Sequence, residues 1–298
     1  MEGPTLTTRH SKAALLTAAL LLAFAAPARP QDQPPNVIEP DRPDVTNGTH
    51  IVDIGLLQVE IGGLYTHAGS LQHAFGSPFT ARVGLFDWLE ARVGTDGLLL
   101  QTDESGRNAG LGNVQLGAKL RLWADPGGVP VLAILPTINL PTANAEKGLG
   151  SGDADYTLAL LTGTDIGRHG HVDLNYGIGS IGAGGGEPHF VQHLISVSAS
   201  AAVSDNWNPY VEAFWFSRQE ADGGSVTSLD VGAIYELGAR FALDGGVQFG
   251  VNGNAPAVAA FWGVSMVVGD ILGNHGVHAR QRNARDRAAR RAARSSTR

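Results

Sequence analysis

Hydrophobic and polar residues alternate along residues 110–123, which read GLGNVQLGAKLRLW. The even positions from 114 to 122 are apolar, and the odd positions from 113 to 121 are polar, charged or glycine. Because successive side chains of a strand point to opposite faces, this pattern predicts a strand with one apolar and one polar face. In a soluble sheet the apolar face packs on a core, whereas in an outer-membrane barrel it contacts lipid and the polar face lines the lumen.

Similar runs recur along most of the chain and predict about twelve strands. Most of them approach the length of about 9 to 11 residues that a tilted strand needs to cross a bilayer. The predicted strands cover approximately residues 56–66, 78–85, 88–95, 112–123, 129–140, 154–164, 171–180, 190–203, 208–217, 226–236, 239–250 and 257–268.

The segments between these strands alternate in length. Short turns are expected at 86–87, 124–128, 165–170, 204–207 and 237–238, and longer loops at 67–77, 96–111, 141–153, 181–189, 218–225 and 251–256. This alternation is typical of outer-membrane barrels, which have short periplasmic turns and longer external loops. We therefore predict an all-β fold, a transmembrane up-and-down antiparallel β-barrel of about twelve strands with both ends in the periplasm.

Five aromatic residues lie beside the predicted short turns. Amphipathic rings are enriched at the headgroup level of a membrane, so we expect these residues to form an interfacial girdle. The alternative is a set of core aromatics that cap a soluble sheet. They are Phe86, Trp88, Trp123, Trp207 and Tyr235.

If the apolar faces contact lipid, the charged residues of the opposite faces line the lumen. Acidic and basic residues are equally numerous among them, so we expect ion pairs or a narrow polar channel rather than a pore that strongly selects one charge. The lumen-lining candidates are Glu60, Glu90, Glu212, Asp230 and Asp244, together with Arg82, Arg92, Lys119, Arg121 and Arg240.

The first 28 residues have the features of a secretory signal peptide. Arg9, His10 and Lys12 precede an uncharged run over residues 13–26, and the small-residue pattern at 26–28 predicts cleavage after Ala28. An N-terminal membrane anchor or a buried helix is the alternative. Export and a barrel together predict the outer membrane of a Gram-negative bacterium as the location.

The rest of the chain divides into three parts. Residues 29–50 are rich in Pro and Asp and predict an extended periplasmic lead-in, residues 51–269 form the barrel, and residues 270–298 are a basic tail. The tail is either disordered and solvated or lies on an anionic membrane surface. The formal charge of −7 combines this tail with an acidic body, so we expect no binding to nucleic acid.

No motif predicts catalysis or a cofactor. The chain has no cysteine, which excludes disulfides, zinc–thiolate sites and a cysteine nucleophile. His169, His171 and Asp173 alternate, and His189 and His193 form a second pair, but neither group has a clear third ligand, so we expect no metal site. The glycine-rich residues 177–186 lack the lysine of a phosphate-binding loop. We expect no enzymatic activity.

Four short segments, in this order, carry a family resemblance: EPDRPDVTNGTH (39–50), GLGNVQLGAKLRL (110–122), LPTINLPTA (135–143) and GSGDADYTLAL (150–160). With them the sequence resembles the outer-membrane β-barrel transporters named for the MetA pathway of phenol degradation. The resemblance covers roughly residues 39–269. It implies a channel that passes small molecules, aromatic or hydrophobic compounds among them, across the outer membrane.

The expected partners are outer-membrane lipid, a small-molecule solute and the outer-membrane assembly machinery. Two other functions stay open at the level of the sequence. One is a closed structural or surface barrel whose loops bind a partner, and the other is a barrel-embedded enzyme.

Overall fold

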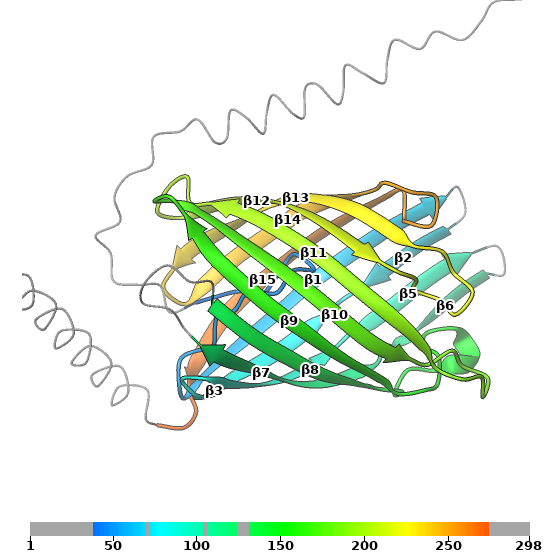
Figure 1. Ribbon diagram of the computed structural model, residues 1–298. Coiled ribbons are helices and arrows are strands. Elements are labelled where there is room, and N and C mark those ends of the chain that lie inside the picture. Colours follow the sequence, from blue (N-terminus) through cyan, green and yellow to red (C-terminus); the bar gives the residue numbers. More distant parts are fainter. Residues whose placement is uncertain (1–37, 70–71, 104–105, 124–130, 274–298) are drawn as a thin grey trace, which may run out of the picture.

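The alternating segments form antiparallel strands that close into a barrel (Figure 1). The computed structural model describes residues 38–69, 72–103, 106–123 and 131–273. The strands are β1 (Leu56–Gly69), β2 (Gln72–Gly76), β3 (Phe79–Phe86), β4 (Leu89–Thr95), β5 (Leu98–Asp103), β6 (Gly106–Leu111), β7 (Val114–Trp123), β8 (Val131–Leu140), β9 (Asp155–Ile166), β10 (Gly170–Ile181), β11 (Phe190–Ala201), β12 (Trp207–Phe216), β13 (Val226–Gly238), β14 (Phe241–Gly250) and β15 (Val258–Asp270).

Hydrogen bonding between the first and last strands closes the sheet. β1 pairs with β15 from Leu56 opposite Asp270 to His67 opposite Val258, and every other ladder joins neighbouring strands of the same barrel. The described residues therefore form a closed antiparallel barrel of twelve strands. The predicted fold class is confirmed.

Three of the twelve barrel strands are each interrupted by two residues. β2 continues into β3, β4 into β5 and β6 into β7, with breaks at 77–78, 96–97 and 112–113. Backbone hydrogen bonds join the second and third breaks, from Asp96 N–H to Asn113 O at 3.1 Å and from Gly112 N–H to Gly97 O at 2.8 Å.

The prediction of long loops at 67–77 and 96–111 is wrong, because most of these residues belong to β1, β2, β5 and β6. Residues of β5 and β6 are exposed or half-buried throughout. A strand with solvent on both faces needs no apolar alternation, so the hydrophobic pattern alone does not reveal it.

Outward-facing apolar residues cover the barrel wall. Leu116 and Leu122, on the apolar face of β7, are 43% and 52% exposed, whereas Lys119 on the opposite face is fully buried. The same alternation of exposed and buried residues occurs in β10 and β15. The apolar face of residues 114–122 therefore points outward, as the sequence predicts.

The two ends of the barrel differ. Short turns at 87–88, 167–169 and 239–240 lie at one end, here called the turn end, where the described chain also begins and ends (Figure 1). The opposite loop end carries the longer connection that contains η1 (Ala145–Lys147). No helix among the described residues is long and apolar enough to cross a membrane.

The five predicted interfacial aromatics lie at the turn end of their strands. Phe86 stacks on Trp88 at 5.5 Å between ring centroids, and Trp207 lies 5.0 Å from Tyr235. Trp123 ends β7 and is 51% exposed. The sequence pattern missed a further group of exposed aromatics nearer the loop end: Tyr65, Tyr156, Tyr176 and Trp262.

Several predictions fall on other parts of the chain. The signal peptide at 1–28, the turn at 124–128 and residues 274–298 of the basic tail lie outside the described residues.

An arginine at Leu160, which points outward in the middle of β9, should destabilise the barrel by about 2–4 kcal/mol, because a charged side chain near the bilayer midplane is desolvated. Equilibrium unfolding in lipid vesicles measures the change. Thr157→Arg, on the inward face of the same strand, is the control and should cost much less. Equal losses from both variants would contradict the assignment of the two faces.

Candidate functional site

The segment before the first strand lies inside the barrel. Residues 38–54, here called the inner segment and drawn in blue in Figure 1, contain no helix or strand and contact the inward faces of strands around the barrel. Asp41, Thr46 and Thr49 are buried. The sequence predicts an extended lead-in here, and nothing in its composition shows that the lumen accommodates it.

A buried cluster of ion pairs holds the centre of the inner segment. The Arg82 guanidinium contacts Glu60 at 2.7 Å, Glu90 at 2.8 Å and Asp41 at 3.3 Å. Lys119 Nζ lies 2.6 Å from Asp41 Oδ2, and Arg92 Nη2 lies 2.9 Å from the same oxygen. These six residues, Asp41, Glu60, Arg82, Glu90, Arg92 and Lys119, are here called the ion-pair cluster.

Asp41 is the only member of the ion-pair cluster that the inner segment supplies. Its burial raises its pKa, but the charges of Arg82, Lys119 and Arg92 outweigh this effect and hold the pKa well below its usual value. The carboxylate is therefore ionised, and it balances positive charge on three strands of the wall.

Backbone atoms of the inner segment also bind the ion-pair cluster. Arg82 donates to Glu39 O at 2.7 Å, and Lys119 donates to Gly48 O at 2.8 Å. Val52 N–H in turn donates to Glu90 Oε2 at 2.9 Å. Charge-assisted hydrogen bonds of this kind satisfy backbone groups that would otherwise be buried without partners.

A second group of contacts holds residues 45–47 against the opposite wall. Glu212 accepts hydrogen bonds from Val45 N–H at 3.0 Å and from both the backbone N–H and the hydroxyl of Thr46. Asn47 and Asn175 exchange two hydrogen bonds, of 2.7 and 3.0 Å. This turn of the inner segment is therefore fixed by β10 and β12.

Glycines in the wall make room for the inner segment. Arg42 forms an ion pair with Asp244 at 3.4 Å and donates to Trp262 O at 3.1 Å. A Cβ at Gly62 or Gly263 would overlap the Arg42 guanidinium, so the close approach requires glycine at both positions. At the turn end the inner segment adds apolar contacts to Leu56, Ala242 and Val267 through Ile38 and Val52.

Only some of the predicted lumen-lining charges form ion pairs with one another. Glu60, Arg82, Glu90, Arg92 and Lys119 are brought together, and Asp244 is paired by Arg42 from the inner segment rather than by the wall.

Two predicted bases lie away from the cluster, and two predicted acids have no base. Arg121 donates to Asp87 O beside the β3–β4 turn, and Arg240 is exposed in the β13–β14 turn. Glu212 and Asp230 face each other across β12 and β13, and no basic side chain of the described residues forms an ion pair with either.

Asp44 extends this acidic region. Burial and the neighbouring Glu212 carboxylate raise the pKa of Asp44 well above its usual value, although a hydrogen bond from Ser198 lowers it. The pKa values of Asp41 and Asp44, three residues apart, are thus shifted in opposite directions.

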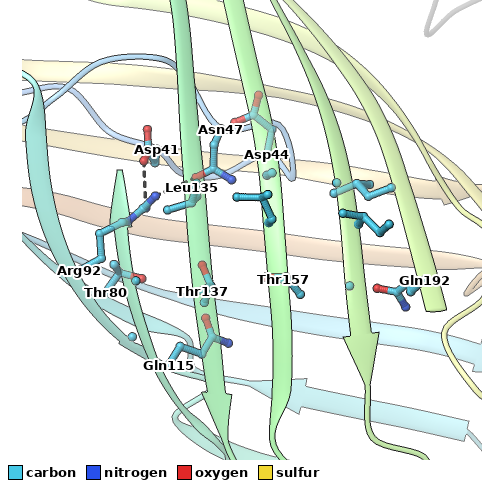
Figure 2. A pocket seen from close by; sticks show the side chains of 18 of the residues that line it. Asp41, Asp44, Asn47, Thr80, Arg92, Gln115, Leu135, Thr137, Thr157 and Gln192 are labelled. Carbon is cyan, nitrogen blue, oxygen red and sulfur yellow. Dashed lines mark hydrogen bonds and ion pairs between the residues drawn. The ribbon is translucent and has the colours of Figure 1, made fainter. Parts of the chain in front are cut away.

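A cavity of about 370 Å³ lies on the loop-end side of the inner segment (Figure 2). Asp41, Asp44 and Asn47 line one side of it, and Figure 2 shows polar side chains from several strands along its wall. Leucine and phenylalanine side chains complete the lining, so the cavity is amphipathic. The wall residues include Thr80, Gln115, Thr137, Thr157 and Gln192, with Leu135, Leu194 and Phe216.

Three of the four histidines that the sequence singled out contact other side chains. His171 lies 2.7 Å from Asp165 and 3.2 Å from Asp173. His193 contacts the Tyr176 hydroxyl, and His189 contacts Ser180.

Comparison with known protein families identifies the family of this chain. Residues 40–267 match the family described as "Putative MetA-pathway of phenol degradation". The chain belongs to this family. The matched range begins inside the inner segment, at the residue before Asp41, and extends into β15, so the family pattern covers both the wall and most of the segment that fills it.

Two solved structures have the same fold as this family member. An outer membrane channel from Pseudomonas putida is similar over 75% of this chain and 100% of that chain, with 15% identity and a TM-score of 0.62. The NanC porin is similar over 70% of this chain and 100% of that chain, with 10% identity and a TM-score of 0.53. No curated protein sequence is significantly similar to the chain.

Arg82→Ala should destabilise the barrel by about 3–5 kcal/mol, because it leaves buried carboxylates without their main counter-charge. Chemical denaturation of the protein refolded in detergent measures this loss. Arg240→Ala, in an exposed turn, should leave the unfolding midpoint unchanged. A midpoint shift of similar size in both variants would contradict the structural role of the cluster.

Binding of the inner segment should weaken as pH rises. An acid whose pKa is raised when the segment is bound holds its proton more tightly in that state, so ionisation of Asp44 at higher pH opposes binding. The pKa of Asp41 is lowered when the segment is bound, so protonation of Asp41 under strongly acidic conditions should also weaken binding of the inner segment. In planar bilayers, conductance should increase as the pH rises above the usual range of a carboxyl group, and it should change less in Asp44→Asn. Identical pH profiles for both proteins would contradict this assignment.

Proposed function

We propose that this protein is an outer-membrane channel for small molecules, whose passage is controlled by the inner segment. The cavity next to the inner segment carries this proposal. It has the size of a small-molecule site, lies inside a closed barrel, and is bounded on one side by a segment held through side-chain contacts. The family and the fold shared with outer membrane channels and porins support the same function.

In this proposal the inner segment is a removable constriction. It has no strand pairing with the wall beyond a single bridge between Ile54 and Gly84. Its central contacts are ion pairs and hydrogen bonds, which can exchange for water when the segment moves. Movement of residues 41–47 away from β10 and β12 would connect the cavity to the turn end.

The cavity suits small amphipathic solutes. Hydroxyl and amide groups of Thr80, Gln115 and Thr137 offer hydrogen bonds, whereas Leu194 and Phe216 offer apolar contact. Small aromatic compounds that carry a polar group can form both the hydrogen bonds and the apolar contacts. The family description, which refers to phenol degradation, supports this class of solute.

A closed structural barrel is the second candidate function. The observation that favours it is the depth of the inner segment's burial, with Asp41 bound to three cations at once. In that case the loops would carry the function by binding a partner.

The same proposal includes residues 1–28 as a signal peptide that directs export, and the outer-membrane assembly machinery as a partner. It also includes the basic tail of residues 270–298. An outer-membrane location requires both export and assembly, and the enclosing barrel supports that location.

Single-channel recording of the refolded mature protein in a planar bilayer separates these functions. We expect discrete conductance steps, with larger or more frequent steps in Glu212→Gln, because this change weakens the acceptor for Val45 and Thr46. Arg240→Gln is the matched control and should behave as the wild type. Silence from both wild type and Glu212→Gln, in protein shown to be folded by its heat-modified mobility on a gel, would contradict the channel and favour the closed barrel.

A further inference from the structure

Two histidines face each other on the hairpin that extends the barrel at its loop end. His67 on β1 and His73 on β2 are directly opposite in the antiparallel register. Their Nδ1 atoms lie 3.1 Å apart, and the rings stack with centroids 4.8 Å apart. The pair lies on the strands rather than in a connecting loop, so the backbone ladder holds the two rings near each other.

The separation of the two nitrogens suits a shared metal ion. Zinc lies about 2.0–2.1 Å from imidazole nitrogen, and two ligands 3.1 Å apart then subtend an angle of roughly 98° at the metal. This angle falls between that of neighbouring ligands in a square or octahedral site and that of a tetrahedral one. Rotation of the rings about χ2, which is a soft torsion in histidine, would direct both lone pairs to one ion.

Without a metal, one Nδ1 must donate to the other. A second hydrogen-bond contact involves the same atom, because the Tyr65 hydroxyl lies 2.9 Å from His73 Nδ1. Three hydrogen-bonding atoms thus converge on one spot of a half-exposed surface.

We propose that His67 and His73 form a binding site for a divalent transition-metal ion that prefers imidazole ligands, with Cu²⁺ bound more tightly than Ni²⁺ or Zn²⁺. The order follows the general affinity series for nitrogen ligands. Among the described residues no group of three or more His, Cys, Asp or Glu side chains is arranged to hold a metal, so water completes the coordination at this pair. The site is independent of solute passage, because it lies on the extending hairpin and not among the residues that line the cavity.

Titration of the untagged full chain, folded in detergent micelles, with Cu²⁺ tests the site. Calorimetry should show one saturable ion per chain, and the electron paramagnetic resonance spectrum should show coupling to imidazole nitrogens. His67→Ala and His73→Ala should each weaken binding by at least about tenfold, the loss that removal of even an outer-shell partner causes.

His193→Ala is the matched control. His193 contacts the Tyr176 hydroxyl at 3.0 Å much as His73 contacts that of Tyr65, but it has no histidine partner among the described residues. Its removal should leave the Cu²⁺ affinity unchanged. His67→Phe keeps an aromatic ring at the stack without a nitrogen, and should also lose binding while the barrel stays heat-modifiable. The proposal fails if the wild type binds no Cu²⁺ saturably, or if His193→Ala weakens binding as much as His67→Ala.

Discussion

The arrangement inside this barrel depends on one buried carboxylate that meets three cations. Arg82, Arg92 and Lys119 project from neighbouring strands into the lumen, where Arg82 and Lys119 are fully buried and the wall supplies only Glu60 and Glu90 to balance the three cations. A buried charge without a partner costs several kcal/mol. Asp41 supplies the missing charge, so the ion-pair cluster is balanced only while the inner segment occupies the lumen.

A second ion pair has the charges reversed, because here the inner segment supplies the cation and the wall supplies the carboxylate. Asp244 belongs to the wall, and its counter-charge Arg42 belongs to the inner segment. Gly62 and Gly263 leave the space that Arg42 occupies. Glycine positions in the wall therefore determine where the inner segment fits, together with the charged residues. Beyond the inner segment, the described residues leave the cavity that Gln115, Thr137 and Phe216 line.

Strand periodicity predicts the wall of this structure well, and the contents of the lumen hardly at all. Alternation identifies Arg82, Glu90 and Lys119 as facing away from the apolar side, because one phase of a strand determines the direction of every second residue. Residues 38–54 have no such period. The ion pair of Lys119 with Asp41 spans 78 residues, and the contact of Glu212 with Thr46 spans 166. No local pattern encodes contacts of that range, so the sequence does not reveal that Asp41 and Arg42 of the inner segment pair with charges of the wall.

The solvent-exposed parts of the first hairpins were also missed, for a different physical reason. The residues of β6 are exposed or half-buried and do not alternate between apolar and polar, so their polarity and glycine content suggest a loop. The family match then adds what the pattern could not: residues 40–267 include most of the inner segment, which indicates that the segment and the barrel belong to one structural unit.

The position of the inner segment is tested most directly by linking it to the wall. The chain has no cysteine, so Asn47→Cys and Asn175→Cys introduce the only two thiols, at residues that exchange two hydrogen bonds. Conductance is then recorded from the same pores before and after a short, cleavable thiol cross-linker is cut. The account predicts that the cross-link forms, holds the pore at its lowest conductance and releases it on cleavage. Two results would contradict the account that the inner segment occupies and controls the lumen. One is that the cross-link does not form in the folded barrel, and the other is that the conductance is the same before and after the cross-link is cut.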